Sequence, residues 1–136
     1  MREITTHHDG LGLNDLIRVE ASDEDANGVP HRFEFFRKLT ESEIVPAHVS
    51  INDNGEILTG FLQFQHGPRN VEESRPGLIS DAVYAALIAV MEGFQNGPFK
   101  SREGAIVLTK LEEAHLWSGK RARDRAKRGV LGYNKA

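Results

Sequence analysis

The stretch FQNGPF, residues 94–99, decides the fold, because it separates two segments that both have the residue pattern of an α-helix. Gly97 gives the backbone room to reverse, and Pro98 lacks the N–H that continuing the preceding helix would require. We therefore predict a tight turn that joins two antiparallel helices into a hairpin. A near copy, FQHGPR, stands 30 positions earlier, at residues 64–69.

The segment before the turn, LISDAVYAALIAVMEG at residues 78–93, is expected to form the first helix. Ser80 and Asp81 are start signals, and Gly93 is a stop signal. Apolar residues occur nearly all round this segment, which is typical of a helix inside a protein. The pattern therefore predicts a buried helix that ends at Gly93.

The segment after the turn is expected to form a longer second helix. Ser101 is a candidate N-cap, Glu103 lies in the first turn, and Gly129 is a natural C-terminal stop. These signals predict a helix of about 27 residues, about 40 Å long at a rise of about 1.5 Å per residue.

The first half of the chain alternates apolar and polar residues, as β-strands do. The tetrapeptide NDNG at residues 52–55 indicates a tight hairpin turn, since Asn and Gly tolerate positive φ. Pro46 lacks an N–H, so its strand should lie at an edge or carry a bulge. We predict a four-stranded antiparallel sheet, with strands at residues 16–21, 31–39, 43–51 and 56–64.

These elements predict an α+β fold, in which an N-terminal four-stranded antiparallel sheet is followed by a C-terminal two-helix hairpin. A chain of 136 residues is expected to form one domain, 1–136. Its β-sheet part should span residues 13–66, and its helical hairpin part residues 78–129.

Composition describes an ordinary soluble protein, with 39% apolar residues, 27% charged residues and no cysteine. The lack of cysteine excludes disulfides, thiolate metal sites and cysteine nucleophiles. The longest apolar run, around residues 85–91, is too short to cross a bilayer, and the N-terminus lacks the apolar core of a signal peptide. We therefore expect no membrane association and a location in the cytoplasm.

The net charge of −3 conceals a strong asymmetry. From Ser118 onward the chain carries seven Lys or Arg and one acid, so this part is +6 and the preceding part is −9. A basic end on an acidic body is typical of proteins that meet an anionic ligand, a nucleic acid or the acidic surface of another subunit.

Seven positions of the second helix follow alternating steps of four and three residues, so they share one stripe. The first half of the stripe is apolar and the second half is basic. The guanidinium groups repel one another unless an anion meets them, and Arg suits phosphate oxygens. Alternatively, the stripe is a solvated helix end, where cations favour the helix dipole. Its members are Val107, Leu111, Ala114, Ser118, Arg121, Arg125 and Arg128, and Asp124 is spaced to pair with Arg121 or Arg128.

Phe94 and Gln95 are not required by the turn itself. They stand next to the start of the second helix, whose free N–H groups attract anions. One interpretation makes Phe94 a core aromatic that closes the hairpin. The other makes it a stacking platform for a flat ring.

Catalytic and metal motifs are absent from the sequence. The six histidines form no helical pair at metal spacing, so no metal site is predicted. No GxSxG elbow, phosphate-binding loop or dinucleotide fingerprint occurs, and the acidic residues show no pattern of a general acid and base. We therefore expect a protein that is not an enzyme, with no catalytic residues and no cofactor.

Several blocks of the C-terminal half carry a family resemblance, over residues 64–132. The blocks are FQHGPR, GFQNGPFKSREGA, LTKLEEAHLW and KRARDRAKRGVLGYN. In this order they resemble the phage Thoeris anti-defence 1 family, which is related through its helical hairpin to the anti-CBASS 2 sponges. The strand-rich N-terminal half resembles the family only in its general pattern.

The resemblance implies a sponge for a host signal. Members of the family bind a cyclic ADP-ribose isomer made by bacterial TIR enzymes, such as glyco-cyclic ADP-ribose, and hold it without cleavage, which inhibits Thoeris immunity. Some members also capture cyclic oligonucleotides at a separate site. The family forms homo-oligomers, dimers or hexamers, with the pocket at a subunit boundary. The implied location is the cytoplasm of the infected bacterial host.

The resemblance also implies roles for single residues. Phe94 matches the aromatic that stacks on adenine, while Arg69, Arg121 and Arg125 match arginines that meet phosphates and riboses. Arg128 continues the same basic stripe. Gly104 stands where the family commonly has an asparagine that hydrogen-bonds the base, so Asn96 or Gln95 would have to supply that donor.

Three other functions remain open from the residues alone. A nucleic-acid-binding protein would use the basic helix end, and its affinity would fall steeply with salt and survive Phe94→Ala. An enzyme that degrades a cyclic nucleotide would release a linearised product. An interaction protein would dock the basic helix end on the acidic sheet of a neighbouring subunit.

Overall fold

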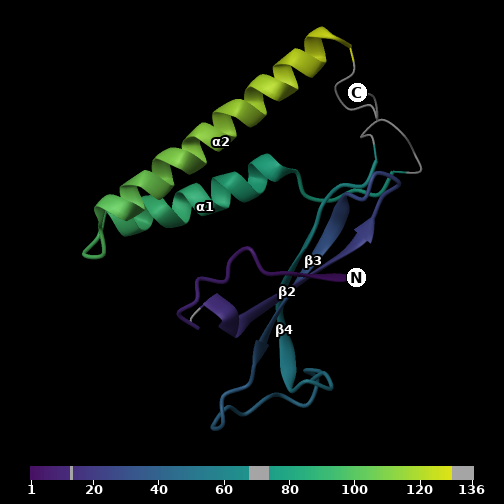
Figure 1. Cartoon of the computed structure of the whole chain (residues 1–136), viewed down its shortest axis with the longest axis vertical. Helices are drawn as coiled ribbons and strands as arrows, with labels where there is room; N and C mark the ends of the chain where they lie inside the picture. The colour runs from purple at the N-terminus through teal and green to yellow at the C-terminus, as the bar shows by residue number, and fades with distance from the viewer. Residues whose placement is uncertain (13, 68–73, 130–136) are drawn as a thin grey trace. The chain divides into compact units, whose positions relative to one another are not determined.

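The computed structural model describes residues 1–12, 14–67 and 74–129. The chain divides into two compact units, Met1–Phe64 and Gln65–Ala136. The first unit holds the strands and the second holds the helices, which confirms the α+β fold class (Figure 1). That residues 1–136 form a single domain stays a prediction.

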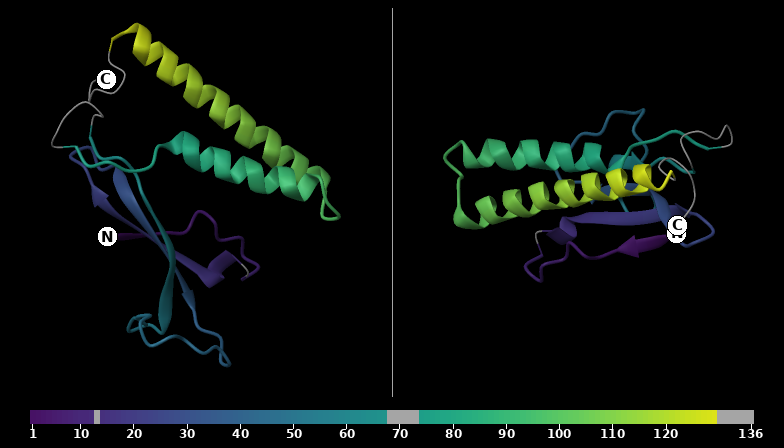
Figure 2. Two further views of the ribbon diagram at one scale, coloured as in Figure 1. Left: turned by 180° about the vertical axis from the view of Figure 1, so that it is seen from behind. Right: turned by 90° about the horizontal axis from the view of Figure 1, so that it is seen from above.

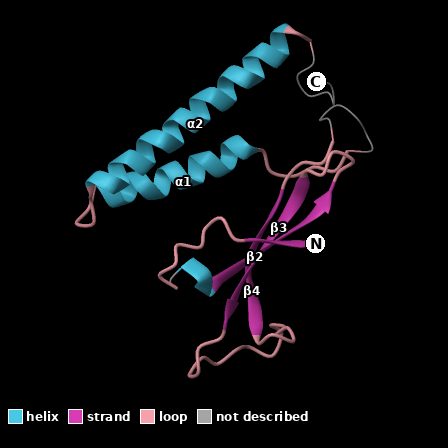
Figure 3. Ribbon diagram, in the orientation of Figure 1, coloured by secondary structure: helices cyan, strands magenta, loops and turns pink. Residues whose placement is uncertain are grey.

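The first unit is an antiparallel meander of four strands, in the order β1-β2-β3-β4 (Figure 3). A 3-10 turn, η1, at Asn14–Leu16 leads into the second strand. The strands are β1 Arg2–Ile4, β2 Ile17–Glu24, β3 Pro30–Lys38 and β4 Glu56–Gln63.

One face of the sheet is apolar. Val19 of β2 lies opposite Phe35 of β3, and Ala21 lies opposite Phe33. Val19, Ala21 and Ile57 are the buried apolar residues of the described chain. The ring of Phe33 meets that of Phe64 edge-on, with centroids 5.8 Å apart, a favoured arrangement for aromatic pairs.

The other face carries paired charges. Arg18 donates to both carboxylate oxygens of Glu56, at 2.9 and 3.0 Å, and also to Glu20. These hydrogen bonds lower the pKa of Glu56, whose residue surface is only 5% exposed. Two guanidinium groups cover rings: Arg18 lies over Phe36 at 4.7 Å, and Arg32 lies over Phe61 at 4.5 Å.

The predicted strand at residues 43–51 is wrong, and the fourth strand is β1 instead. Pro46 cannot donate to a ladder, and its carbonyl accepts a hydrogen bond from the N–H of Val49, which forms a turn. Glu43 folds back onto Arg37, which donates to it at 2.8 Å. That pairing and the backbone N–H of Thr40 lower the pKa of Glu43 to about 2. The NDNG turn opens β4 but does not join two strands.

The second unit is the predicted helical hairpin, with α1 at Ser80–Gln95 and α2 at Arg102–Lys127. Figure 2 shows α1 and α2 joined by the turn into a hairpin, and in the left view the helices diverge away from the turn. Ser101 is the N-cap of α2, as predicted, because its Oγ accepts a hydrogen bond from the N–H of Gly104 at 2.9 Å. Gly129 follows the end of α2 with a φ of +70°, the left-handed conformation that favours glycine.

Two predictions for the first helix are wrong. Gly93 does not end α1, since one glycine costs only about 1 kcal/mol in a helix and the hydrogen bonds continue to Asn96. Phe94 and Gln95 therefore form the last turn of α1. The helix is also not buried: none of its residues reaches full burial in the described chain. A single partner helix can cover only one of its faces.

The packed seam between the helices is closed by polar contacts at both ends. At the turn, Gln95 donates to the carbonyl of Ser101 at 2.9 Å and accepts from its N–H at 3.1 Å. At the open end, the hydroxyl of Ser118 donates to Asp81 in the first turn of α1. The two contacts fix the register of the hairpin.

The near copy FQHGPR does not repeat the structure of FQNGPF. Gln65 and His66 are extended, and their N–H groups bond to the carbonyls of Leu78 and Arg75. Gly67 has a φ of +90°, which begins the connection toward Ser74. Hence the residue pair Phe-Gln leads into a backbone bridge at residues 64–66 and forms the end of a helix at residues 94–95.

Candidate functional site

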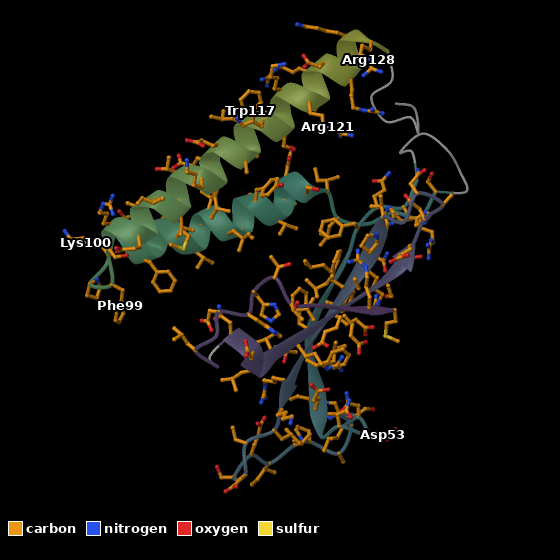
Figure 4. All side chains as sticks on the ribbon, viewed as in Figure 1. Asp53, Phe99, Lys100, Trp117, Arg121 and Arg128 are labelled. Carbon is orange, nitrogen blue, oxygen red and sulfur yellow. The ribbon has the colours of Figure 1, made fainter. Side chains whose placement is uncertain are left out.

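Three of the predicted site residues, Arg121, Arg125 and Arg128, come together at the C-terminal end of α2. They line an open hollow of about 480 Å³. Figure 4 labels Trp117, Arg121 and Arg128 along this part of the helix. The other residues that line the hollow are Trp117, Lys120 and Asp124.

The unequal length of the helices exposes this region. The bond between Ser118 and Asp81 places the start of α1 beside Ser118, while α2 continues to Lys127. The last turns of α2 therefore extend past the N-terminal end of α1 (Figure 1). Residues of α1 therefore do not cover Arg121, Arg125 and Arg128, which follow Ser118 on the same stripe of α2.

The charges of this helix end are unbalanced. Residues 118–129 hold six Lys or Arg and only one acid, Asp124. Asp124 accepts a hydrogen bond from Lys120 at 2.7 Å, on an exposed surface where such a pair contributes at most about 1 kcal/mol. Within the described residues, Arg121 makes no hydrogen bond or ion pair. Its guanidinium group is therefore available to an anion.

Phe94 is at the other end of the hairpin. It lies in the last turn of α1 and is 47% exposed, which does not fit a core aromatic that closes the hairpin. Asn96 is the exposed C-cap of the same helix. Gln95 uses its amide to hold the turn, which leaves one of its two N–H donors for other contacts.

Phe94 and the arginines do not meet within one hairpin. Gly104 lies beside Gln95, since a Cβ on Gly104 would stand 2.4 Å from the Gln95 side-chain oxygen. From Gly104 to Arg121 the helix rises about 25 Å at 1.5 Å per residue. That separation is far beyond the reach of either side chain. A single chain thus presents Phe94 at the turn of the hairpin and, at the opposite end, a basic cluster formed by Arg121, Arg125 and Arg128.

Arg69, the remaining predicted ligand residue, lies outside the described residues. Sequence reasoning missed Trp117, which lines the hollow together with the arginines. A signal was present: Trp117 precedes Arg121 by four positions and Arg125 by eight, so the three share a helical face.

The described residues offer neither a metal-binding cluster nor a membrane-spanning helix. Across residues 1–12, 14–67 and 74–129, no group of three or more His, Cys, Asp or Glu side chains could hold a metal ion. Neither of the described helices combines the length and apolar character that a membrane span requires.

Comparison with known proteins relates the hairpin to a described family. Residues 61–123 match the family model described as "Acb2/Tad1, hairpin domain", so the helical part of the chain is similar to this family. A curated protein of Bacillus phage SBSphiJ7, named "Thoeris anti-defense 1", is 41% identical over 78 residues. The match covers 57% of this chain and 53% of that protein, so it spans about half the length of the curated relative. The resemblance to the Thoeris anti-defence 1 family is thereby confirmed.

Proposed function

We propose that this protein is a phage anti-defence protein that sequesters a TIR-derived cyclic ADP-ribose signal, glyco-cyclic ADP-ribose, and so inhibits Thoeris immunity. The observation that carries the proposal is the basic end of α2, where Arg121 lacks a partner among the described residues. The family match of the hairpin supports it. The site of action would be the cytoplasm of the infected bacterium.

The basic cluster suits the phosphates of such a ligand. A diphosphate carries about two negative charges, and each hydrogen bond from a guanidinium group to a charged oxygen contributes about 1.5–3 kcal/mol. Arg121 and Arg125 are one helical turn apart, so both can reach one diphosphate. Together with an aromatic stack of about 1–3 kcal/mol, these contacts are sufficient for micromolar or tighter binding.

A complete pocket requires a second copy of the chain. Phe94 of α1 and Arg121 of α2 lie at opposite ends of the hairpin, about 25 Å apart along its length. An antiparallel partner hairpin would bring its Phe94 next to the arginines of the first chain. Leu87 and Val90 support this arrangement, because they are exposed on α1, two turns and one turn before Phe94 respectively, and offer an apolar contact surface. We therefore propose a homo-oligomer, a dimer or a hexamer, as the binding form.

The composition of the cluster supports retention without cleavage. Arginine cannot act as a general base, because it stays protonated at all physiological pH values. The acid in the hollow, Asp124, is paired with Lys120. The proposed ligand would therefore be gripped and released chemically unchanged, and the protein would act by capture alone. Cyclic oligonucleotides would be captured at a separate site, as the family resemblance implies.

The test is capture of the signal by the purified protein, followed by heat release and mass analysis of the ligand. We expect intact glyco-cyclic ADP-ribose to be recovered. Arg121→Ala should weaken binding by about 10- to 150-fold, since it removes one or more charged hydrogen bonds. Arg123→Ala is the matched control, because Arg123 is on the same helix end but does not line the hollow.

Other outcomes would contradict the proposal in distinct ways. Recovery of a linearised product would assign the protein to the nucleotide-degrading enzymes. Binding of oligonucleotides that falls steeply with salt and survives Phe94→Ala would assign it to the nucleic-acid-binding proteins. Equal loss in Arg121→Ala and Arg123→Ala would mean that only net charge matters and that the hollow is not the site.

A further inference from the structure

Trp117 is an exposed aromatic beside the basic cluster. It is the one tryptophan of the chain, and 68% of its surface is accessible. It lines the same hollow as Arg121 and Arg125. Neither the turn nor the seam of the hairpin uses it, because its neighbour Ser118 is the residue that contacts Asp81 of α1.

The position of Trp117 on the helix gives it a defined relation to the arginines. Arg121 is four residues later and Arg125 eight residues later, so both lie on the same side of α2. An indole presents a large flat apolar face and attracts flat rings and cations. Leaving that face exposed is unfavourable in water, whereas covering it with a ring is favourable. A ligand with a flat ring next to its phosphates would satisfy both features at once.

We propose that Trp117 is a base-stacking residue of the nucleotide site, on which a purine lies flat while its phosphates meet Arg121 and Arg125. The inference rests on the proposed function and deepens it, because it adds an aromatic contact from the same chain that supplies the arginines. A base has two faces. The stack on Trp117 leaves the other face available to Phe94 of a second copy.

Fluorescence provides a direct test without any variant, since Trp117 is the one tryptophan of the chain and its emission can be excited selectively over that of the tyrosines. The probe is glyco-cyclic ADP-ribose. In the free protein, acrylamide should quench the emission efficiently. Bound ligand should quench the emission itself and shield the ring from acrylamide. A ring already shielded from acrylamide in the free protein would overturn the inference, because it would then be covered by a protein surface.

Two variants separate stacking from packing. Trp117→Leu keeps apolar bulk but removes the aromatic face, and it should weaken binding of the same probe by about 5- to 150-fold. Trp117→Phe keeps an aromatic face and should retain most of the affinity. The dependence of affinity on salt should be unchanged in both, because the charged contacts remain. Helical content and oligomer mass should match those of the wild-type protein.

The failure of this inference is distinguishable from that of the proposed function. If Trp117→Leu binds within twofold of wild type while Arg121→Ala does not bind, the site is correct and Trp117 has no part in it. If the wild-type protein does not bind the probe, both proposals are wrong. If Trp117→Leu and Trp117→Phe lose affinity equally and change oligomer mass, Trp117 is a residue of the subunit interface and the stacking assignment is overturned.

Discussion

In the sheet unit, arginines are paired within the chain, whereas at the end of the hairpin basic residues outnumber acids and Arg121 has no partner among the described residues. Arg18 bonds to Glu56 and Glu20 and also covers a ring, and Arg37 is held by Glu43. The hairpin also leaves its aromatic side chains Phe94 and Trp117 exposed. The charges and rings of the sheet thus contact one another, whereas Arg121, Phe94 and Trp117 of the hairpin are exposed to solvent.

Glu56→Ala tests the sheet side of this comparison, and we expect it to cause the largest loss of folding stability. Removing one partner of a buried ion pair costs about 3–5 kcal/mol, and the value here should lie at the lower end because Arg18 keeps Glu20. Urea denaturation would measure the loss. Glu24→Ala is the control, since its pair with Arg2 is exposed and contributes at most about 1 kcal/mol. Equal losses in both variants would mean that the Arg18 network does not stabilise the sheet.

Ser118→Ala tests whether the open end of the hairpin depends on its one hydrogen bond to Asp81. A hydrogen bond to a charged group contributes about 1.5–3 kcal/mol, and partial exposure of both residues places the expected loss near 1.5 kcal/mol. Thermal denaturation followed by circular dichroism would measure it. Thr109→Ala, an exposed change in the same helix, should cause no loss. A Ser118→Ala protein as stable as Thr109→Ala would show that the bond is not needed for the register.

Gly93→Ala should stabilise the hairpin by about 1 kcal/mol, because alanine favours a helix over glycine. No heavy atom lies within 4 Å of the position that the new Cβ would occupy. Gly104→Ala is the matched comparison: its Cβ would stand 2.4 Å from the side-chain oxygen of Gln95, so the gain should be smaller or absent. A higher melting temperature for Gly104→Ala than for Gly93→Ala would contradict this account.

The smallest expected effect is the response of the loop at Glu43 to acid. The pKa of Glu43 is lowered from 4.5 to about 2, chiefly by the hydrogen bond from Arg37. A carboxylate with a lowered folded pKa stabilises the fold above its unfolded pKa, and this contribution is lost as the pH falls from about 4.5 to about 2. Nuclear magnetic resonance titration of the Glu43 side chain should follow the change. Glu43→Gln should remove this pH dependence, and an unshifted titration near 4.5 would refute the pairing.

The helices could be predicted from the sequence because their signals are local. The N-cap at Ser101, the turn at Pro98 and the glycine at Gly129 each act within a few residues. The sheet was predictable only in part. The first strand, Arg2–Ile4, exists because it pairs with β2, which lies far along the chain. The false strand at residues 43–51 begins at Glu43, which is folded back by Arg37, a side-chain pairing that strand periodicity does not reveal.

The candidate site, too, could be predicted from the sequence only where its signals are local. The arginine stripe follows from helical spacing alone, and the structure brings Arg121, Arg125 and Arg128 together at one hollow. The distance between Phe94 and that stripe depends on which end of the hairpin each occupies, so a list of candidate residues could not reveal it. Trp117 was missed because an aromatic next to an apolar segment is usually a core residue, and its helical spacing to the arginines does not by itself show that its ring is exposed.

The unequal length of α1 and α2 also has a bearing on protein engineering. The reach of the uncovered helix end is set by where α1 begins, at Ser80, and not by any single side chain. Splicing one more helical turn ahead of Ser80 would slide a new row of residues alongside the guanidinium groups. The exposed length of α2 could thus be changed through the length of α1, while Arg121, Arg125 and Arg128 stay as they are.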